Sequence, residues 1–253
     1  MLLLGYVCAF AIGVILGMLG GGGSILTVPV FVYVLGYDPK LAIAMSLPVV
    51  GATSLVGAAA HWRAGNVQVR TAILFGAVAM SSAYVAARLS TRLASRTQLL
   101  VLSVAMVAAA VVMLRDALRA PRTVPTGDGH PPFGITLLLA GLVVGVLTGI
   151  IGIGGGFLIV PALVVLARVP MQRAVGTSLT VIAMNAAAAF AGQPAVRDVP
   201  IAFVVAFGAV AMAGIVAGTS VARRVDQRTL KRAFATLLLV IAAGVLSQNL
   251  AHW

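Results

Sequence analysis

Residues 17–29 read GMLGGGGSILTVP and lie inside an apolar run that extends from position 2 to position 37. Glycine is a poor helix former and proline removes a backbone donor, so this stretch disfavours a continuous helix. A straight helix of about 35 residues would be about 50 Å long, whereas the apolar core of a bilayer is about 30 Å thick. The stretch therefore predicts a broken helix, either two half-helices joined by unwound chain or a re-entrant hairpin.

The composition of the whole chain indicates a membrane protein. Of its 253 residues, 61% are hydrophobic and 9% are charged, whereas a soluble domain has about 25% charged residues. We therefore predict an all-α polytopic membrane protein. The apolar runs lie at 2–37, 41–62, 67–90, 97–118, 133–167, 174–193, 199–222 and 230–250.

The formal net charge of +12 comes from Lys and Arg residues at the ends of these runs. We interpret them as loop charges that set the orientation and contact anionic lipid, and we expect no nucleic-acid partner. The single cysteine, Cys8, excludes an internal disulfide and a cysteine-cluster metal site. The sequence predicts no cofactor and no metal.

The chain contains an internal repeat at a shift of 132 residues. Pro29 aligns with Pro161, and from 13 to 49 the ungapped alignment has 14 identities in 37 positions. The aligned glycines are Gly13, Gly17, Gly20, Gly22 and Gly23 with Gly145, Gly149, Gly152, Gly154 and Gly155. A polar segment rich in Pro and Gly, 119–134, separates the two copies. We predict a first repeat at 1–118, a linker at 119–134 and a second repeat at 135–253.

The topology has two interpretations. With eight crossings each half has four, the repeats are parallel, and Lys and Arg divide eleven against six. If the two long runs do not cross, each half has three crossings, the repeats are inverted, and the division is twelve against five. We prefer about eight segments as two repeats of four, with the first segment of each broken at its glycines. The charge rule then places both termini outside the cytoplasmic membrane.

The glycine break is the first candidate site. Unwound backbone at membrane depth is tolerated only where it is buried in protein or lines a cavity, and a restarting helix directs N–H groups and its positive dipole end at that place. The candidate substrate-binding residues here are Gly22, Gly23, Ser24, Thr27, Gly154, Gly155 and Gly156, and the helix-break positions are Gly20, Pro29, Gly152 and Pro161. The alternative is close helix packing, which we favour for the spaced pairs Gly13/Gly17, Gly145/Gly149 and Gly214/Gly218.

Two further groups of polar residues repeat or lie at the ends of runs. Ser46 aligns with Ser178 and Thr53 aligns with Asn185, while Thr177 adds a hydroxyl. These side chains either bind substrate or form interhelical hydrogen bonds. His61 and Arg63, with Gln193 aligned to His61, are candidates for a proton or gate function. For the triplet His61-Trp62-Arg63 we favour an interfacial anchor.

No Asp or Glu lies in the interior of an apolar run; Asp116 is close to the end of the run at 97–118. Proton relays and cation sites usually need such acids, and an intramembrane hydrolase needs a buried catalytic set. The sequence therefore disfavours a cation carrier and an enzyme. Helix ends, hydroxyls and amides favour an anion.

The segments GVILGMLGGGGSILTVPV and GVLTGIIGIGGGFLIVPA, each followed by SLP or SLT, closely resemble the sulfite exporter TauE/SafE family, also called the TSUP transporters. The resemblance covers nearly the whole chain. It implies a secondary carrier of sulfur-containing or organic anions such as sulfite, sulfoacetate, thiosulfate or 2-oxo acids, with efflux driven by the proton gradient. The halves differ where Ser24 aligns with Gly156, and where His61-Trp62-Arg63 aligns with Gln193-Pro194-Ala195.

The predicted function is an inner-membrane exporter of sulfite, organosulfonate or related anions, coupled to the proton gradient. Its partners are a small anion and membrane lipid. We expect the two glycine breaks to face each other near the middle of the membrane. The alternatives are an uncoupled anion channel and a membrane scaffold that moves no solute.

Overall fold

The structure, a computed structural model, describes residues 2–21, 23–90, 95–118, 135–151, 156–191 and 199–251. Across these ranges the regular elements are all helical, which confirms the predicted all-α class. In chain order they are α1 (Leu2–Leu19), α2 (Ser24–Pro29), the π-helix η1 (Val30–Val34), α3 (Pro39–Arg63), α4 (Val69–Ser90), α5 (Ser95–Leu118), α6 (Ile135–Ile151), α7 (Gly156–Pro161), the π-helix η2 (Ala162–Leu166), α8 (Met171–Ala191), α9 (Ile201–Ala222) and α10 (Gln227–Ala251).

Four helices in the described ranges are long and apolar enough to cross a membrane: Leu41–Arg63, Val69–Ala86, Leu100–Leu118 and Ile201–Ala222. Shorter apolar helices cover Leu3–Leu19, Ile25–Val34, Ile135–Ile150 and Gly156–Leu166. This set fits a polytopic membrane protein. The number of crossings depends on whether the two broken segments cross. The division at 119–134 lies outside the described residues and stays a prediction.

The first apolar run is broken where the glycines predict. α1 ends at Leu19 and α2 begins at Ser24, and Gly20 adopts a φ of +80°, a conformation that favours glycine. The chain then folds back along α1. The close approach of Gly23 to α1 shows this, since a Cβ on Gly23 would lie 2.7 Å from the carbonyl oxygen of Ile12. At the far end of η1, Leu35 packs against the position of Gly5. The broken segment is therefore a hairpin that returns to the side on which α1 begins.

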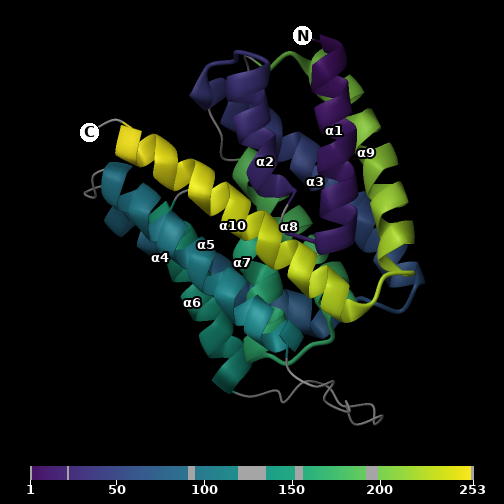
Figure 1. Ribbon diagram of the computed structural model, residues 1–253, viewed down its shortest axis with the longest axis vertical. Helices are drawn as coiled ribbons and strands as arrows, with labels where there is room; N and C mark the ends of the chain where they lie inside the picture. The colour runs from purple at the N-terminus through teal and green to yellow at the C-terminus, as the bar shows by residue number, and fades with distance from the viewer. Residues whose placement is uncertain are drawn as a thin grey trace.

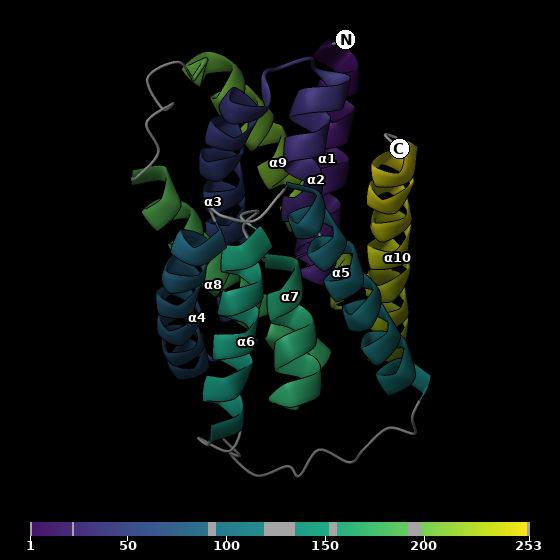
Figure 2. The ribbon, with the colours of Figure 1, turned by 90° about the vertical axis from the view of Figure 1, so that its left-hand side faces the viewer.

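The second broken run has matching helix bounds, since α6 ends at Ile151 and α7 begins at Gly156. The residues between them, 152–155, lie outside the described part. The first helices of the two halves begin at opposite ends of the molecule (Figure 2), so the two broken segments extend toward each other.

Repeat-equivalent helices run antiparallel. In the contact between α3 and α8, Gly51 faces Ala186 and Gly57 faces Leu179, so residue numbers rise along one helix as they fall along the other. In the α5–α10 pair, Asp116 near the end of α5 bonds Lys231 near the start of α10. The repeats are therefore inverted, and the preferred parallel arrangement is wrong, because each half begins with a hairpin that makes no net crossing.

The two ends of the molecule can be named by what lies there. The terminal side carries the start of α1 and the end of α10, which lie toward the same end in Figures 1 and 2. The ion-pair side carries the Asp116–Lys231 pair, the end of α3 and the start of α8. These names are used below.

The two halves are interleaved. α1 packs along α9, and α6 packs along α4, so the first helix of each half lies beside the third long helix of the other (Figure 1). A Cβ on Gly13 would overlap the carbonyl oxygen of Ala211, and one on Gly218 would overlap that of Val14. A Cβ on Gly145 would likewise overlap the backbone of Ala79 on α4. These contacts confirm the packing interpretation of the spaced glycines.

Pro29 and Pro161, predicted as helix-break positions, lie where the helix changes type. Each ends a short α-helix and is followed by a π-helix. Backbone bonds five and six residues apart recur at the same repeat positions: Leu35 N to Val30 O (3.1 Å) and Tyr37 N to Phe31 O (3.0 Å), then Ala167 N to Ala162 O (3.1 Å) and Val169 N to Leu163 O (2.9 Å). These bonds span more residues than the four of an α-helix, so the chain winds more widely after each proline.

The chain leaves both π-helices through a left-handed residue. This residue is Gly36 in the first half, with a φ of +75°, and Arg168 in the second half, with a φ of 54°. The two positions are related by the repeat shift of 132. Arg168 therefore occupies a conformation that costs a residue with a Cβ about 1–2 kcal/mol.

We expect Gly218→Ala to destabilise the protein by about 1–3 kcal/mol, because the added Cβ overlaps backbone and α1 and α9 must separate. Gly208→Ala is the matched control on the same helix, since nothing lies within 4 Å of its added Cβ. Thermal unfolding of both purified variants in detergent measures the difference. Equal midpoints would contradict the close backbone contact between α1 and α9.

We expect Gly36→Ala to destabilise the protein by about 1 kcal/mol through backbone strain alone, because nothing lies within 4 Å of the added Cβ. Gly244→Ala adds a methyl in equally open space within α10 and should be neutral or slightly stabilising, since alanine is the better helix former. Arg168→Gly should stabilise the second half. Thermal midpoints of the three variants check the order, and a gain for Gly36→Ala would refute the left-handed assignment.

Candidate functional site

The first break contacts the start of α7 through backbone alone. A Cβ on Gly21 would overlap the carbonyl oxygen of Gly156 and lie 2.8 Å from the Cα of Phe157. The hairpins of the two halves therefore meet at a point where Gly21 has no room for a side chain. This contact brings together two of the predicted segments. Of the predicted glycines, Gly22, Gly152, Gly154 and Gly155 lie outside the described residues.

The first break also packs on α8. A Cβ on Gly20 would lie 2.6 Å from Ser178 Oγ and 3.0 Å from the side chain of Val160. Ser178 is buried, and its Oγ donates to the carbonyl oxygen of Val175 at 2.8 Å. The predicted residue Ser178 thus lies directly against the predicted break.

The helix α2 begins at the break without a side-chain cap. Gly23 is its N-cap and forms no side-chain hydrogen bond there. Thr27 is buried and its Oγ1 donates to Gly23 O at 3.4 Å, which directs this hydroxyl toward the break. Leu26 N donates to Gly23 O at 3.1 Å. The N–H groups of Ser24 and Ile25, which come before it, have no partner within the helix. The side chain of Ser24 is not among the described ones.

Most of the predicted hydroxyls already donate within their own helices. Ser46 Oγ donates to Ile43 O at 2.8 Å, and Thr53 Oγ1 donates to Val49 O at 2.6 Å. A hydroxyl has one hydrogen, so each of these side chains would have to turn from its carbonyl before it could donate to an anion. Thr177 differs, because its Oγ1 accepts from Gln68 N at 3.1 Å and keeps its own hydrogen.

A cavity of about 450 Å³ lies between α3 and α8, and no described glycine of the two breaks lines it. Repeat-equivalent residues line it in pairs, such as Gly51 with Ala183 and Leu55 with Ala187. Its walls are almost entirely apolar and carry no charged side chain, so they do not complement an anion. Asn185 lies on the same stretch of α8, and its Oδ1 is buried with no partner in the described part of the chain.

The triplet at the end of α3 divides into two environments. Trp62 is 59% exposed and Arg63 is exposed, which fits an interfacial anchor. His61 is only 1% exposed, so the anchor interpretation is wrong for this residue. Its Nε2 lies 3.4 Å from Gly17 O, and its Nδ1 is buried without a partner among the described residues. Gln193 lies outside the described ranges.

Sequence reasoning missed Thr219, whose Oγ1 is also buried without a partner in the described ranges. Thr219 is 2% exposed and lies against Gly17 of α1, on the helix that carries the Gly214/Gly218 pair. The residue at the equivalent repeat position is Ala87, so the alignment of the two halves does not single out a hydroxyl at this position. The adjacent pair of close-packing glycines is the signal that could have indicated a buried hydroxyl there.

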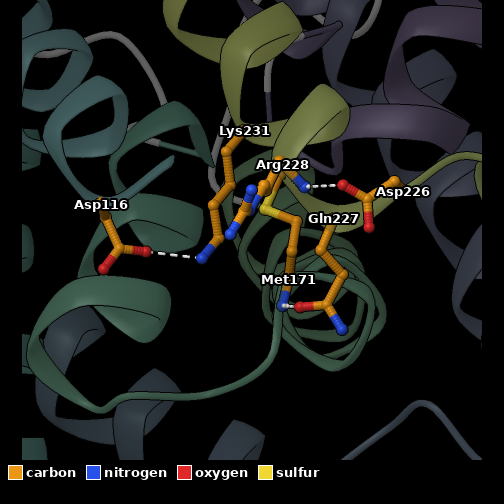
Figure 3. Close-up of polar contacts among 6 residues, drawn as sticks. All are labelled: Asp116, Met171, Asp226, Gln227, Arg228 and Lys231. Atoms are coloured by element: carbon orange, nitrogen blue, oxygen red, sulfur yellow. Dashed lines mark hydrogen bonds and ion pairs between the residues drawn. The ribbon is translucent and has the colours of Figure 1, made fainter. Parts of the chain in front are cut away.

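Polar contacts join three helices on the ion-pair side (Figure 3). Lys231 of α10 bonds Asp116 of α5 at 2.5 Å, and both side chains are partly buried. Met171 N at the start of α8 donates to Gln227 Oε1 at 3.3 Å, and Arg228 N donates to Asp226 Oδ2 at 3.0 Å. The start of α10 therefore holds both α5 and α8.

The sequence does not repeat this network on the terminal side. The position equivalent to Lys231 is Leu99, and the position equivalent to Met171 is Pro39, which has no N–H to donate. The pseudo-symmetric molecule is therefore joined by different chemistry at its two ends.

Comparison with known proteins gives the family. The model of the family described as "Sulfite exporter TauE/SafE" matches residues 5–245. The chain is 35% identical over 173 residues to a "Probable membrane transporter protein" of Xylella fastidiosa strain Temecula1, which covers 66% of this chain and 64% of that protein. It is also similar to proteins of the same description from Methanocaldococcus jannaschii (26% identity, 71% of this chain and 67% of that protein) and Bacillus subtilis strain 168 (26%, 68% and 71%).

The aligned part thus spans less than two thirds of the length of the Xylella relative. No solved structure matches the chain. The family match covers both glycine breaks, both copies of the repeat and the helices that surround them. The chain belongs to the sulfite exporter TauE/SafE family of membrane proteins.

Proposed function

We propose that the protein is a secondary transporter that exports sulfite, organosulfonates or related small anions across the cytoplasmic membrane, coupled to the proton gradient. The observation that carries this proposal is the contact of Gly21 with Gly156, where two oppositely directed hairpins meet through backbone. Transporters built from inverted repeats bind substrate at such discontinuous helices near the middle of the membrane. The family match and the names of the relatives support a membrane transporter.

The central members of the proposed binding set border this contact. The uncapped start of α2 supplies backbone donors, Thr177 supplies a hydroxyl hydrogen, and Thr27 and Ser178 border the break. The remaining proposed residues are Gly22, Gly23, Ser24, Ser46, Thr53, Gly154, Gly155, Gly156 and Asn185. The described core contains no buried acid, so no fixed negative charge opposes an anion there.

Inverted repeats also suggest how access alternates. When one inverted half exchanges its conformation with the other, a site between them opens to the opposite side of the membrane. The hairpins reach the glycine contact from the two sides, and the polar network at the start of α10 joins only the ion-pair side. We propose that this network holds the ion-pair side closed in the conformation described here.

The orientation follows from the inverted arrangement. With three crossings per half, twelve of the 17 Lys and Arg residues fall on the ion-pair side and five on the terminal side. Basic loops are retained in the cytoplasm. We therefore propose that the ion-pair side is cytoplasmic and that both termini lie outside the inner membrane.

Flux in proteoliposomes tests the transport function. We expect saturable movement of one anion from a panel of sulfite, sulfoacetate, thiosulfate, pyruvate and sulfate, with stimulation by a pH gradient. Flux that does not saturate and follows only the membrane potential would identify a channel. No flux of any panel anion by folded protein would contradict the transporter proposal and favour a scaffold.

Gly21→Val tests the glycine contact. We expect flux to fall at least tenfold, because the side chain overlaps the backbone of Gly156 and blocks the place where the hairpins meet. Gly208→Ala is the control and should keep flux within about twofold, since its Cβ meets no atom within 4 Å. Helix content and elution profile establish that both variants insert and fold. Unchanged flux by folded Gly21→Val would remove the glycine contact from the mechanism.

A further inference from the structure

Proton coupling needs a group that can hold a proton inside the protein. In the described part of the chain, His61 is the buried titratable side chain: the other buried polar residues are serines and threonines. The described acids lie elsewhere, with Asp38 after η1, Asp116 paired to Lys231 on the ion-pair side, and Asp226 exposed before α10. The helices around the glycine contact therefore offer one candidate for the coupled proton.

The ring of His61 is arranged to accept a proton on one nitrogen. Its Nε2 lies 3.4 Å from the carbonyl oxygen of Gly17, which only accepts hydrogen bonds, so Nε2 carries the hydrogen in the neutral ring. The lone pair then resides on Nδ1, which is buried and has no partner among the described residues. A proton that reaches the ring therefore binds at Nδ1 and converts the ring to an imidazolium.

Among the described residues of the helices packed around the His61 ring, one cationic side chain and no carboxylate lie nearby. α1 has no charged residue between Leu2 and Leu19, and α9 contributes Thr219 and Arg223, whose Nη2 donates to Ala60 O at 2.9 Å. α8 contributes Gly176, where a Cβ would lie 2.8 Å from His61 Cβ, and its Arg173 is exposed. On the helix of His61 itself, Arg63 is exposed. No described carboxylate faces the ring to balance an imidazolium.

His61 also lies beside the glycine contact. Gly17, which faces the ring from α1, is three residues before Gly20, and Gly176, which faces it from α8, is two residues before Ser178. Gly20 and Ser178 are in contact with each other at the break. Three helical residues span about 4.5 Å, so the ring lies about one helical turn from the proposed anion site.

We propose that His61 binds the coupled proton, and that proton and anion cross the membrane together in the same direction. The proposal rests on the transport function proposed above. The imidazolium lacks a carboxylate partner in the described structure, and a bound anion about one turn away supplies the missing negative charge. Since opposite charges attract in a site removed from water, the proton and the anion each bind more tightly when the other is present.

The charge balance separates this mechanism from exchange. One proton added at Nδ1 and one monoanion at the break carry no net charge when they cross together, and both leave on the same side. Exchange of a monoanion for a proton in the opposite direction moves two charges per cycle. Export by cotransport is therefore driven by the outward gradient of the anion, carries a proton out with it, and is opposed by a proton gradient that is directed inward.

Pyruvate and sulfite flux in proteoliposomes tests the proposal with His61→Gln, which keeps hydrogen-bonding capacity and cannot be protonated. For wild type we expect an acidic exterior to drive pyruvate inward and a potassium diffusion potential to have little effect. For His61→Gln we expect the pH-driven accumulation to fall at least tenfold, while exchange of labelled for unlabelled anion stays within about threefold. Trp62→Phe, at the exposed neighbouring position, should behave as wild type.

Pyruvate accumulation by His61→Gln that follows the pH gradient as in wild type would overturn the assignment of His61. Wild-type flux that an acidic interior drives inward would overturn cotransport. If wild type moves neither probe, the transport function proposed above fails, and nitrogen NMR of histidine-labelled protein in nanodiscs then decides the role of His61. A His61 resonance, identified by its loss in His61→Gln, that titrates between pH 5 and 9 and shifts with added sulfite supports the site. A resonance unaffected by both overturns it.

Discussion

The fold depends on a contact that only backbone can make. Gly21 and Gly156 approach so closely that a Cβ on Gly21 would overlap a carbonyl group. Each hairpin can therefore end in the interior of the protein, supported by the hairpin from the other side. Lipid cannot satisfy unpaired backbone groups, so a hairpin that stops partway across the membrane needs such a protein partner. The glycines supply the space, and the surrounding long helices exclude the lipid.

Close backbone packing also holds the surrounding helices. In a bilayer the hydrophobic effect does not bring apolar helices together, and contact between small residues replaces it. The α1–α9 and α4–α6 pairs use glycines for this purpose, with Gly13 and Gly218 in one pair and Gly145 in the other. The same residue type thus has two functions, which the sequence distinguishes by spacing: spaced glycines pack helices, and contiguous glycines break one.

Much of this architecture follows from the sequence. The composition predicted an all-α membrane protein, and the contiguous glycines predicted the break that separates α1 from α2. The direction of the repeats did not follow, because apolar runs of similar length are compatible with a crossing segment and with a hairpin, and the charge rule admitted both. The burial of individual side chains could not be predicted from the sequence either. His61 and Trp62 are neighbours in the chain, yet His61 is buried and Trp62 is exposed, because a helix turns about 100° per residue. Thr219 and the polar contacts of α10 depend on long-range packing that local patterns do not encode.

Because the two halves are interleaved, the first helix is synthesised long before the helix against which it packs. The partner of α1 is α9, which begins at Ile201, about 180 residues after α1 ends. At a synthesis rate of about 5–20 residues per second, the glycine face of α1 is in the membrane for about 10–40 s before α9 exists. During that time Gly13 and Gly17 face lipid or another protein. The first half alone therefore lacks the main packing partner of α1, and the native packing of this helix is completed only after α9 has been synthesised.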